Sequence, residues 1–267
     1  YIWKEVMKNI AFYGGGNISQ AVIEGLIFSG LSPKNIFFVD RNTKNQNKLK
    51  KLKVRSLKNN KKVKIDLFIL AVKPKDAIEA YQEIITNFKN PKVACLVAGI
   101  KSKKYTNLDK EVEFLGAMPN TSSRFGLGIT AVYNSSFKKT NLLKVVALLK
   151  KIGIVIKVDK ESKIDEFTGT IGSGPAYFFY LLKSYEKKLM NICNGDKKIV
   201  RAVMVNLIKG VGTSVENNGN LNDLIEAVKS KKGTTEAGLK SFQSNKLGIS
   251  FEKGLNCLLY KSDAADE

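Results

Sequence analysis

The stretch at residues 9–30, NIAFYGGGNISQAVIEGLIFSG, constrains the fold more than any other part of the chain. Its apolar run Ile10–Tyr13 predicts a short buried strand, and Gly14, Gly15 and Gly16 follow at once, before a helical pattern begins. A strand, a glycine turn and a helix aim free backbone N–H groups and the positive helix end at a phosphate. Ser19 stands at the third glycine of the G-x-G-x-x-G motif, where its small size still permits close packing. A plain strand-to-helix connection is the alternative.

Strand and helix patterns then repeat along the first part of the chain. Apolar runs predict further strands at 36–39, 54–57, 66–72, 93–97, 112–118 and 154–158, with a segment at 129–133 that can pair with 112–118. Helical stripes separate most of these runs. The repeated order predicts an α/β fold, with a doubly wound Rossmann-type parallel sheet over residues 9–159. Residues 1–8 are expected to be an N-terminal extension outside this domain.

Ligands of such a sheet bind at the carboxyl ends of its strands. At these ends the chain carries Gly14–Gly16, Asp40-Arg41, Lys73-Pro74, Ala98-Gly99 and Pro119-Asn120. At the second strand, an acid binds the ribose 2′-OH of NAD, whereas an arginine accepts the 2′-phosphate of NADP. Asp40 and Arg41 give both signals at once, and a strand-to-helix turn without a ligand is the alternative reading of this tip.

The second part of the chain lacks strand signals. Helical patterns lie at 176–190, 199–215, 221–228 and 251–259, and the first of these is apolar nearly all round. A helix of that kind must be buried in a large core or between subunits. Residues 160–267 are therefore expected to form an all-α C-terminal domain that also makes an oligomer.

Composition excludes several kinds of chemistry. The chain has no histidine, so the Ser-His-Asp triad, the Cys-His dyad and His-ligated zinc are excluded, and no metal site is expected. Cys95, Cys193 and Cys257 are odd in number, far apart and in apolar surroundings, which favours free thiols in a reducing cytoplasm. No apolar run reaches the roughly 18–20 residues of a membrane span and no signal-peptide pattern begins the chain, so a cytoplasmic protein without a membrane partner is expected.

The formal charge of +21 raises the alternative of nucleic-acid binding. Bidentate recognition of bases and phosphates favours arginine, and the lysines here are spread along the chain without a recognisable nucleic-acid module. Arginine occurs only at Arg41, Arg55, Arg124 and Arg201. We therefore interpret the lysines as a solvated surface whose field favours anionic ligands, such as a dinucleotide phosphate, and expect no nucleic-acid partner.

Five motifs together resemble one enzyme family. They are GGGNIS at 14–19, AVKP at 71–74, MPNT at 118–121, TGTIGSGPAY at 168–177 and SKKGTT at 230–235. In this order and spacing they resemble pyrroline-5-carboxylate reductase, over the chain from about Asn9 to Leu259. The family reduces Δ1-pyrroline-5-carboxylate to L-proline with NAD(P)H, the last step of proline biosynthesis. The resemblance implies NADPH as the cofactor, with NADH as the other option, a small-molecule substrate, and a homodimer that assembles further into a decamer.

The resemblance also implies which residues bind the cofactor. Arg41 would lie near the 2′-phosphate, and Asn59 matches a cofactor asparagine to within one residue. The pyrophosphate would be cradled by Tyr13, Gly14, Gly15, Gly16, Asn17 and Ile18. The nicotinamide and its ribose would be lined by Ala71, Val72, Lys73, Pro74, Val97, Ala98 and Gly99.

Three further residues are implied for the substrate. Glu161, at the start of the long helix, would be a proline-site residue. Thr234 and Thr235, in a loop that opens a helix, would hold the substrate carboxylate through backbone N–H groups, and the Thr235 hydroxyl would hydrogen-bond the ring nitrogen as the catalytic group. Lys231 and Lys232 stand where the family has a Pro-Gly pair. The loop is therefore expected either to be more mobile or to attract the anionic substrate.

Two other functions stay open at this stage. A reductase of the β-hydroxyacid dehydrogenase type has a similar two-domain plan and a catalytic lysine, for which Lys183 or Lys187 could be proposed, although both lie on a polar helix edge. A non-catalytic dinucleotide- or nucleic-acid-binding protein is the alternative from a different class, suggested by the charge. Comparing turnover of pyrroline-5-carboxylate with turnover of hydroxyacids separates the two reductases. Steep salt-dependent DNA binding without NADPH turnover would favour the binding protein.

Overall fold

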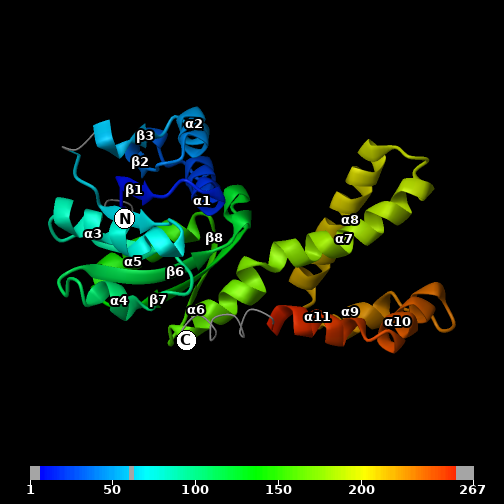
Figure 1. Cartoon of the computed structure of the whole chain (residues 1–267). Helices are drawn as coiled ribbons and strands as arrows, with labels where there is room; N and C mark the ends of the chain where they lie inside the picture. Colours follow the sequence, from blue (N-terminus) through cyan, green and yellow to red (C-terminus); the bar gives the residue numbers. More distant parts are fainter. Residues whose placement is uncertain (1–6, 60–62, 257–267) are drawn as a thin grey trace. The chain divides into compact units, whose positions relative to one another are not determined.

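The computed structural model describes residues 7–59 and 63–256. The chain divides into two compact units, the first extending to Ser173 and the second beginning at Gly174 (Figure 1).

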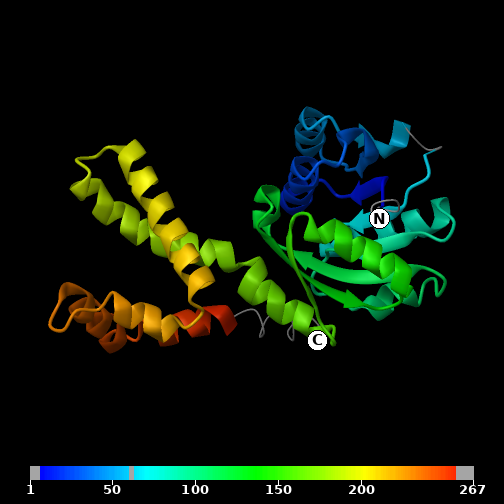
Figure 2. The same ribbon diagram turned by 180° about the vertical axis from the view of Figure 1, so that it is seen from behind.

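Within the described residues, the first unit is built on one eight-stranded sheet (Figures 1 and 2). The strands lie in the order β3-β2-β1-β4-β5-β6-β7-β8. Their bounds are β1 (Ile10–Tyr13), β2 (Ile36–Val39), β3 (Arg55–Ser56), β4 (Leu67–Leu70), β5 (Lys92–Cys95), β6 (Glu113–Pro119), β7 (Gly128–Asn134) and β8 (Gly153–Lys157). Strands β6 and β7 pair antiparallel and the other neighbours pair parallel, so the doubly wound sheet and the pairing of 112–118 with 129–133 are confirmed. The order reverses at β1, which pairs with both β2 and β4.

Helices cover both faces of this sheet, which explains why its central strands are apolar runs rather than alternating patterns. They are α1 (Asn17–Phe28), α2 (Thr43–Lys51), α3 (Ala77–Asn87), α4 (Ser102–Thr106), α5 (Lys139–Lys150) and α6 (Ser162–Phe167). Alternate residues of β1 face opposite cores: Phe12 packs in one cluster with residues of α1 and α5, and Tyr13 in another with residues of α3. Ser19 is fully buried on α1, as the expected close packing requires.

The start of the sheet domain differs from the expected extension at residues 1–8. Met7 is only 4% exposed and lies in the same core cluster as Ile10, and Lys8 N donates a hydrogen bond to Asp66 Oδ2 at 2.9 Å. Met7 and Lys8 therefore belong to the domain, because the carboxylate of Asp66 fixes the chain entering β1. Residues 1–6 of the expected extension lie outside the described residues.

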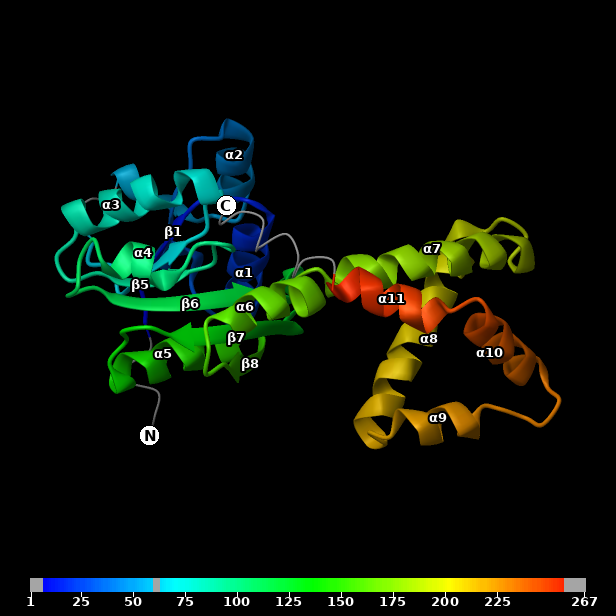
Figure 3. The same cartoon turned by 60° about the horizontal axis from the view of Figure 1, so that its bottom comes forward.

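The second unit consists of helices in its described part (Figure 3). They are α7 (Gly174–Ile192), α8 (Lys197–Asn217), α9 (Leu221–Ala227), α10 (Thr234–Ser244) and α11 (Leu247–Asn256). The helices expected at 176–190, 199–215 and 221–228 are confirmed. The last one begins earlier than expected, at Leu247, and residues 257–259 of that expectation, with Cys257, lie outside the described residues.

Helix α7 exposes large apolar side chains in the single chain. Phe178, Phe179 and Tyr180 are 62%, 66% and 76% exposed. The sequence allows this helix to be buried either in a large core or between subunits. Because these side chains are exposed in the single chain, we infer that they are buried between subunits. None of the described helices is both long enough and apolar enough to span a membrane.

Candidate functional site

The glycine turn after β1 passes between the ends of three strands. Gly14 N donates a hydrogen bond to Val39 O at 2.8 Å, and Ala71 N donates to Tyr13 O at 2.7 Å. Gly14 has φ of +100°, and a Cβ there would lie 2.3 Å from Ala71 O. Only glycine fits this position, because both the dihedral angle and the contact with backbone exclude a side chain.

The helix that follows leaves its N-terminal end open. Gly16 is the N-cap of α1 and makes no side-chain hydrogen bond, and a Cβ on it would meet nothing within 4 Å. Asn17 and Ile18 are the first two residues of the helix. Their N–H groups belong to the first turn, which has no intrahelical acceptors. The turn and the helix end therefore form a cradle that suits a phosphate.

Asp40, at the tip of β2, is bound by groups of the protein itself. Its Oδ2 accepts hydrogen bonds from Gly15 N at 2.5 Å and Asn45 Nδ2 at 3.1 Å, and its Oδ1 accepts one from Asn42 N at 2.5 Å. The carboxylate thus ties the glycine turn to the start of α2. The sequence indicated that Asp40 could bind the ribose 2′-OH. In this structure its carboxylate oxygens instead accept hydrogen bonds from the glycine turn and the start of α2.

Arg41 lies at the open rim of the same site. Its side chain is 73% exposed, and Nη2 donates to Glu79 Oε1 at 2.6 Å. This hydrogen bond and the charge of Glu79 raise the pKa of Arg41 above its usual value. An exposed ion pair of this kind is weak, and a guanidinium has five N–H donors, so Arg41 can turn to an anionic ligand.

A cavity of about 280 Å³ joins the ends of β1, β2 and β4. Its volume is close to the lower end of the range for small-molecule sites. Of the residues expected at the cofactor, it is lined by Tyr13, Gly14, Gly15, Gly16, Arg41, Ala71, Val72 and Lys73. Three of the five strand ends that the sequence predicted to converge, those of β1, β2 and β4, meet at this cavity.

Side chains of α3 and the turn before it complete the cavity wall, and the sequence reasoning missed them. Asp76, Ala80 and Glu83 line it, while Glu79 pairs with Arg41. Tyr13 OH donates to Glu83 Oε1 at 3.5 Å, and burial first, then Glu83, raises the pKa of Tyr13. The signal was available: Asp76, Glu79 and Glu83 recur at helical spacing after the helix-opening Pro74.

A smaller cavity of about 70 Å³ lies at the end of β5 and along β6. It brings together Val97, Gly99 and Glu161, three residues expected at the nicotinamide and the substrate. Glu161 Oε1 accepts a hydrogen bond from Ser102 N at 2.5 Å, so the start of α4 fixes this carboxylate. Cys95 also lines the cavity, and burial raises the pKa of its thiol to about 11.

Other expected residues occupy neighbouring positions. Pro74 opens a 3₁₀ turn at Pro74–Asp76, and Ala98 packs against the core cluster of Met118. Asn59 ends a 3₁₀ turn at Leu57–Asn59, and its side chain lies outside what the structure describes. Asn120, at the end of β6, is buried and its Oδ1 accepts from Ile129 N at 3.2 Å, which makes it a structural link.

In the second unit, Thr234 and Thr235 are the first two residues of α10, whereas the sequence placed them in the loop that opens this helix. Gly233 is the N-cap and has no side chain to satisfy the first N–H groups. Lys183 and Lys187, the lysines of the rival reductase, lie on α7 in a groove lined also by Lys197, Lys198 and Arg201. They belong to a cluster of cations rather than to the cavities described above.

Comparison with known families and proteins agrees with this plan. The family described as "Pyrroline-5-carboxylate reductase dimerisation" matches residues 161–263, and the one described as "NADP oxidoreductase coenzyme F420-dependent" matches residues 9–97. The pyrroline-5-carboxylate reductase of Haemophilus influenzae is 30% identical over 262 residues, which cover 96% of each chain. Pyrroline-5-carboxylate reductase 2 of Bacillus subtilis is 30% identical over 90% of this chain and 88% of its own.

Two solved structures share the fold over nearly the whole chain. A pyrroline-5-carboxylate reductase from Coxiella burnetii is 26% identical, with a TM-score of 0.81 over 97% of this chain and 98% of its own. A pyrroline carboxylate reductase from Plasmodium falciparum, solved with NADP bound, has a TM-score of 0.86 at 21% identity and covers 97% of this chain and 99% of its own. At 21% identity, the similarity to the Plasmodium falciparum structure shows a shared fold only.

Proposed function

Because this chain belongs to the pyrroline-5-carboxylate reductase family, we propose specific roles for its residues in the reaction of that family. The chain reduces Δ1-pyrroline-5-carboxylate to L-proline by hydride transfer from NAD(P)H, the last step of proline biosynthesis. The observation that carries the assignment of the cofactor site is the cavity at the ends of β1, β2 and β4, with the glycine turn in its wall.

The cofactor residues follow from that cavity. Gly14, Gly15 and Gly16, with the first N–H groups of α1, hold the pyrophosphate, and Tyr13 closes the wall behind them. Arg41, at the rim, receives the 2′-phosphate of NADPH, which favours NADPH over NADH. The nicotinamide and its ribose are lined by Ala71, Val72, Lys73, Pro74, Val97, Ala98 and Gly99. Asn59 contributes from the turn before β4.

The substrate is bound through backbone N–H groups, a hydroxyl and a carboxylate. The backbone N–H groups of Thr234 and Thr235, at the positive end of α10, hold the substrate carboxylate, and the Thr235 hydroxyl bonds the ring nitrogen. Glu161 lies in the cavity with Val97 and Gly99 and contacts the proline ring. Each of these groups places the imine rather than attacking it.

The reaction requires little acid–base catalysis by the protein. When bound, the cofactor supplies the hydride that adds to the imine carbon, and the ring nitrogen takes a proton. A cyclic imine can be protonated in solution near neutral pH, so a strong acid is not required, which agrees with a chain that has no histidine. Thr235 orients the nitrogen and contributes about 10²-fold to the rate, the range of one positioned hydrogen-bonding group. The alignment of the nicotinamide with the imine carbon supplies the remaining rate enhancement.

The chain forms homo-oligomers through its helical part. The match at residues 161–263 supports a functional boundary near residue 160, with residues 9–159 binding the dinucleotide and residues 160–267 binding substrate and forming the dimer. The exposed aromatic side chains of α7 support the dimer. We further propose that five dimers assemble into a decamer and that the protein is located in the cytoplasm.

The experiment that tests these roles compares two substrates. NADPH and NADH oxidation is followed in parallel with pyrroline-5-carboxylate and with 1-pyrroline, which lacks the carboxylate. Thr235→Ala is expected to lower kcat/KM for both imines by about 10²-fold, and Arg41→Ala to raise KM for NADPH alone. Wild-type kcat/KM in Thr235→Ala contradicts the role of the hydroxyl. Oxidation of hydroxyacids with NADP+, without reduction of either imine by NADPH, contradicts the substrate assignment.

A further inference from the structure

The segment that leads into α10 contains a strained backbone conformation. Gly233 N donates a hydrogen bond to Ser230 O at 2.9 Å, which closes a four-residue turn with Lys231 and Lys232 at its centre. Lys232 has φ of +60°, in the left-handed region that residues with a Cβ adopt only at a cost. A turn with positive φ at its third position is normally built from Pro-Gly, and here both residues are lysine.

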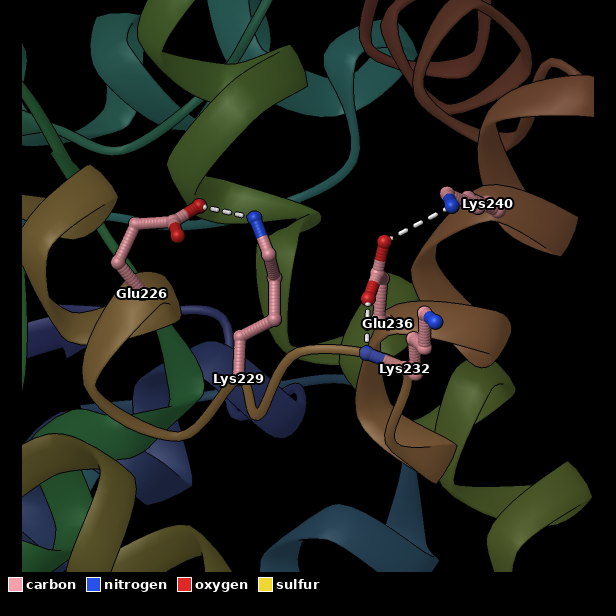
Figure 4. A network of polar contacts seen from close by, with 5 residues as sticks. All are labelled: Glu226, Lys229, Lys232, Glu236 and Lys240. Carbon is pink, nitrogen blue, oxygen red and sulfur yellow. Dashed lines mark hydrogen bonds and ion pairs between the residues drawn. The ribbon is translucent and has the colours of Figure 1, made fainter.

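Glu236 holds this turn from the first turn of α10 (Figure 4). Its Oε2 accepts a hydrogen bond from the backbone N of Lys232 at 2.6 Å, and its Oε1 lies 2.8 Å from Lys240 Nζ. Lys240 stands one helical turn further along α10, where it supports the carboxylate from the other side. The hydrogen bond with Lys240, and then the one from Lys232 N, lower the pKa of Glu236. The acceptor is therefore ionised at neutral pH.

Two backbone N–H groups at the start of α10 remain available to a ligand. Gly233 N bonds to Ser230 O, and Ala237 N bonds to Gly233 O at 3.2 Å. Glu236 takes the N–H of Lys232, which precedes the helix. In the described part of the chain, the N–H groups of Thr234 and Thr235 have no protein acceptor, as expected for the first turn of a helix without a side-chain cap.

We propose that Glu236 is a positioning residue for the substrate carboxylate. It holds Lys232 in the left-handed conformation and so fixes the turn from which the N–H groups of Thr234 and Thr235 emerge. It supplies the restraint that a Pro-Gly pair would otherwise supply, so the Lys-Lys replacement leaves the loop ordered. This inference rests on the proposed role of the two threonines, and Glu236 itself contacts neither substrate nor cofactor.

Steady-state kinetics of Glu236→Ala, Lys232→Gly and the double variant test the proposal. Glu236→Ala is expected to raise KM for pyrroline-5-carboxylate about tenfold, or roughly 1.4 kcal/mol, with kcat within about twofold and KM for NADPH unchanged. Glycine adopts positive φ without a restraint. The double variant is therefore expected to return to within about threefold of Lys232→Gly alone. Glu236→Gln, which keeps an acceptor oxygen, is expected to fall between wild type and Glu236→Ala.

The chain offers a matched control nearby. Glu226 Oε1 lies 2.6 Å from Lys229 Nζ, in a Glu–Lys pair that precedes the turn (Figure 4), and Lys229 attracts Glu236 through its charge. Glu226→Ala is expected to leave both KM values unchanged. Lys240→Ala, which removes only the outer support of Glu236, is expected to have a smaller effect than Glu236→Ala.

A substrate without a carboxylate separates the inference from the proposed function. KM for 1-pyrroline is expected to be the same in wild type and Glu236→Ala. If Glu236→Ala behaves like Glu226→Ala, or if Lys232→Gly brings no rescue, the positioning role is wrong. Thr234→Pro removes one of the two backbone N–H donors at a helix position that tolerates proline. If this variant leaves the preference for the carboxylated imine intact, the proposed carboxylate site itself is wrong. If Glu236→Ala fails to fold, the comparison of the double variant with Lys232→Gly still decides.

Discussion

Replacing Gly14 by alanine tests the physical reason for the glycine turn. Alanine at φ of +100° costs about 1–2 kcal/mol from the backbone alone. Its Cβ would also lie 2.3 Å from Ala71 O and 2.9 Å from Val72 N, and because these are backbone atoms they yield only if β4 shifts. Forced overpacking of this kind costs roughly 1–3 kcal/mol. The sum is a loss of about 2–5 kcal/mol in the free energy of unfolding.

Gly30 provides the matched control. It has φ of +96°, almost the same as Gly14, but a Cβ there would meet nothing within 4 Å. Gly30→Ala is therefore expected to lose only the backbone contribution, about 1–2 kcal/mol. Urea unfolding of both variants without cofactor, followed by circular dichroism, measures the difference directly. If Gly14→Ala is no less stable than Gly30→Ala, the close approach of the turn to β4 does not determine the need for glycine.

Three further outcomes follow from the structure. Asp40→Asn, which removes a charged acceptor of Gly15 N, is expected to destabilise the protein by about 1–2 kcal/mol in urea unfolding; an unchanged midpoint would contradict its role in the turn. Glu79→Ala frees Arg41 and is expected to keep or lower KM for NADPH, whereas a clear increase would show that the ion pair serves binding. Cys95 is 4% exposed with a thiol pKa of about 11, so iodoacetamide at pH 8 is expected to modify Cys193 before Cys95 in a mass-spectrometric time course. Early labelling of Cys95 would contradict its burial. The raised pKa favours the neutral thiol, so its contribution to the free energy of unfolding is present below the ordinary thiol pKa of 9.0 and is lost as the pH rises toward 11.

The central strands of the first unit, such as β1 and β4, could be predicted because they are buried on both faces and appear as continuous apolar runs. Their ends were less certain. The run 66–72 extends past both ends of β4, since Asp66 turns its carboxylate to Lys8 N and Asn9 N, and Ala71 bonds to Tyr13 O. The ends of a strand are set by hydrogen bonds to neighbouring strands, and the apolar character of the local sequence does not indicate these bonds.

The candidate site could be predicted where it depends on position along the chain, and not where it depends on side-chain partners. Strand ends converge in any doubly wound sheet, so the placement of Gly14–Gly16 beside Ala71 followed from topology. The use of Asp40 by the turn could not be foreseen, because its partner Gly15 lies 25 residues earlier. Likewise the contact between Glu236 and Lys232 N depends on a left-handed backbone that composition does not indicate.

Direct measurement of the product tests the central claim most simply. The purified chain is incubated with pyrroline-5-carboxylate and NADPH, and L-proline is quantified by chiral amino-acid analysis against NADPH consumed. One L-proline is expected for each NADPH oxidised, with the rate falling about 10²-fold in Thr235→Ala. NADPH oxidation without proline, or no oxidation by a folded protein, would contradict it.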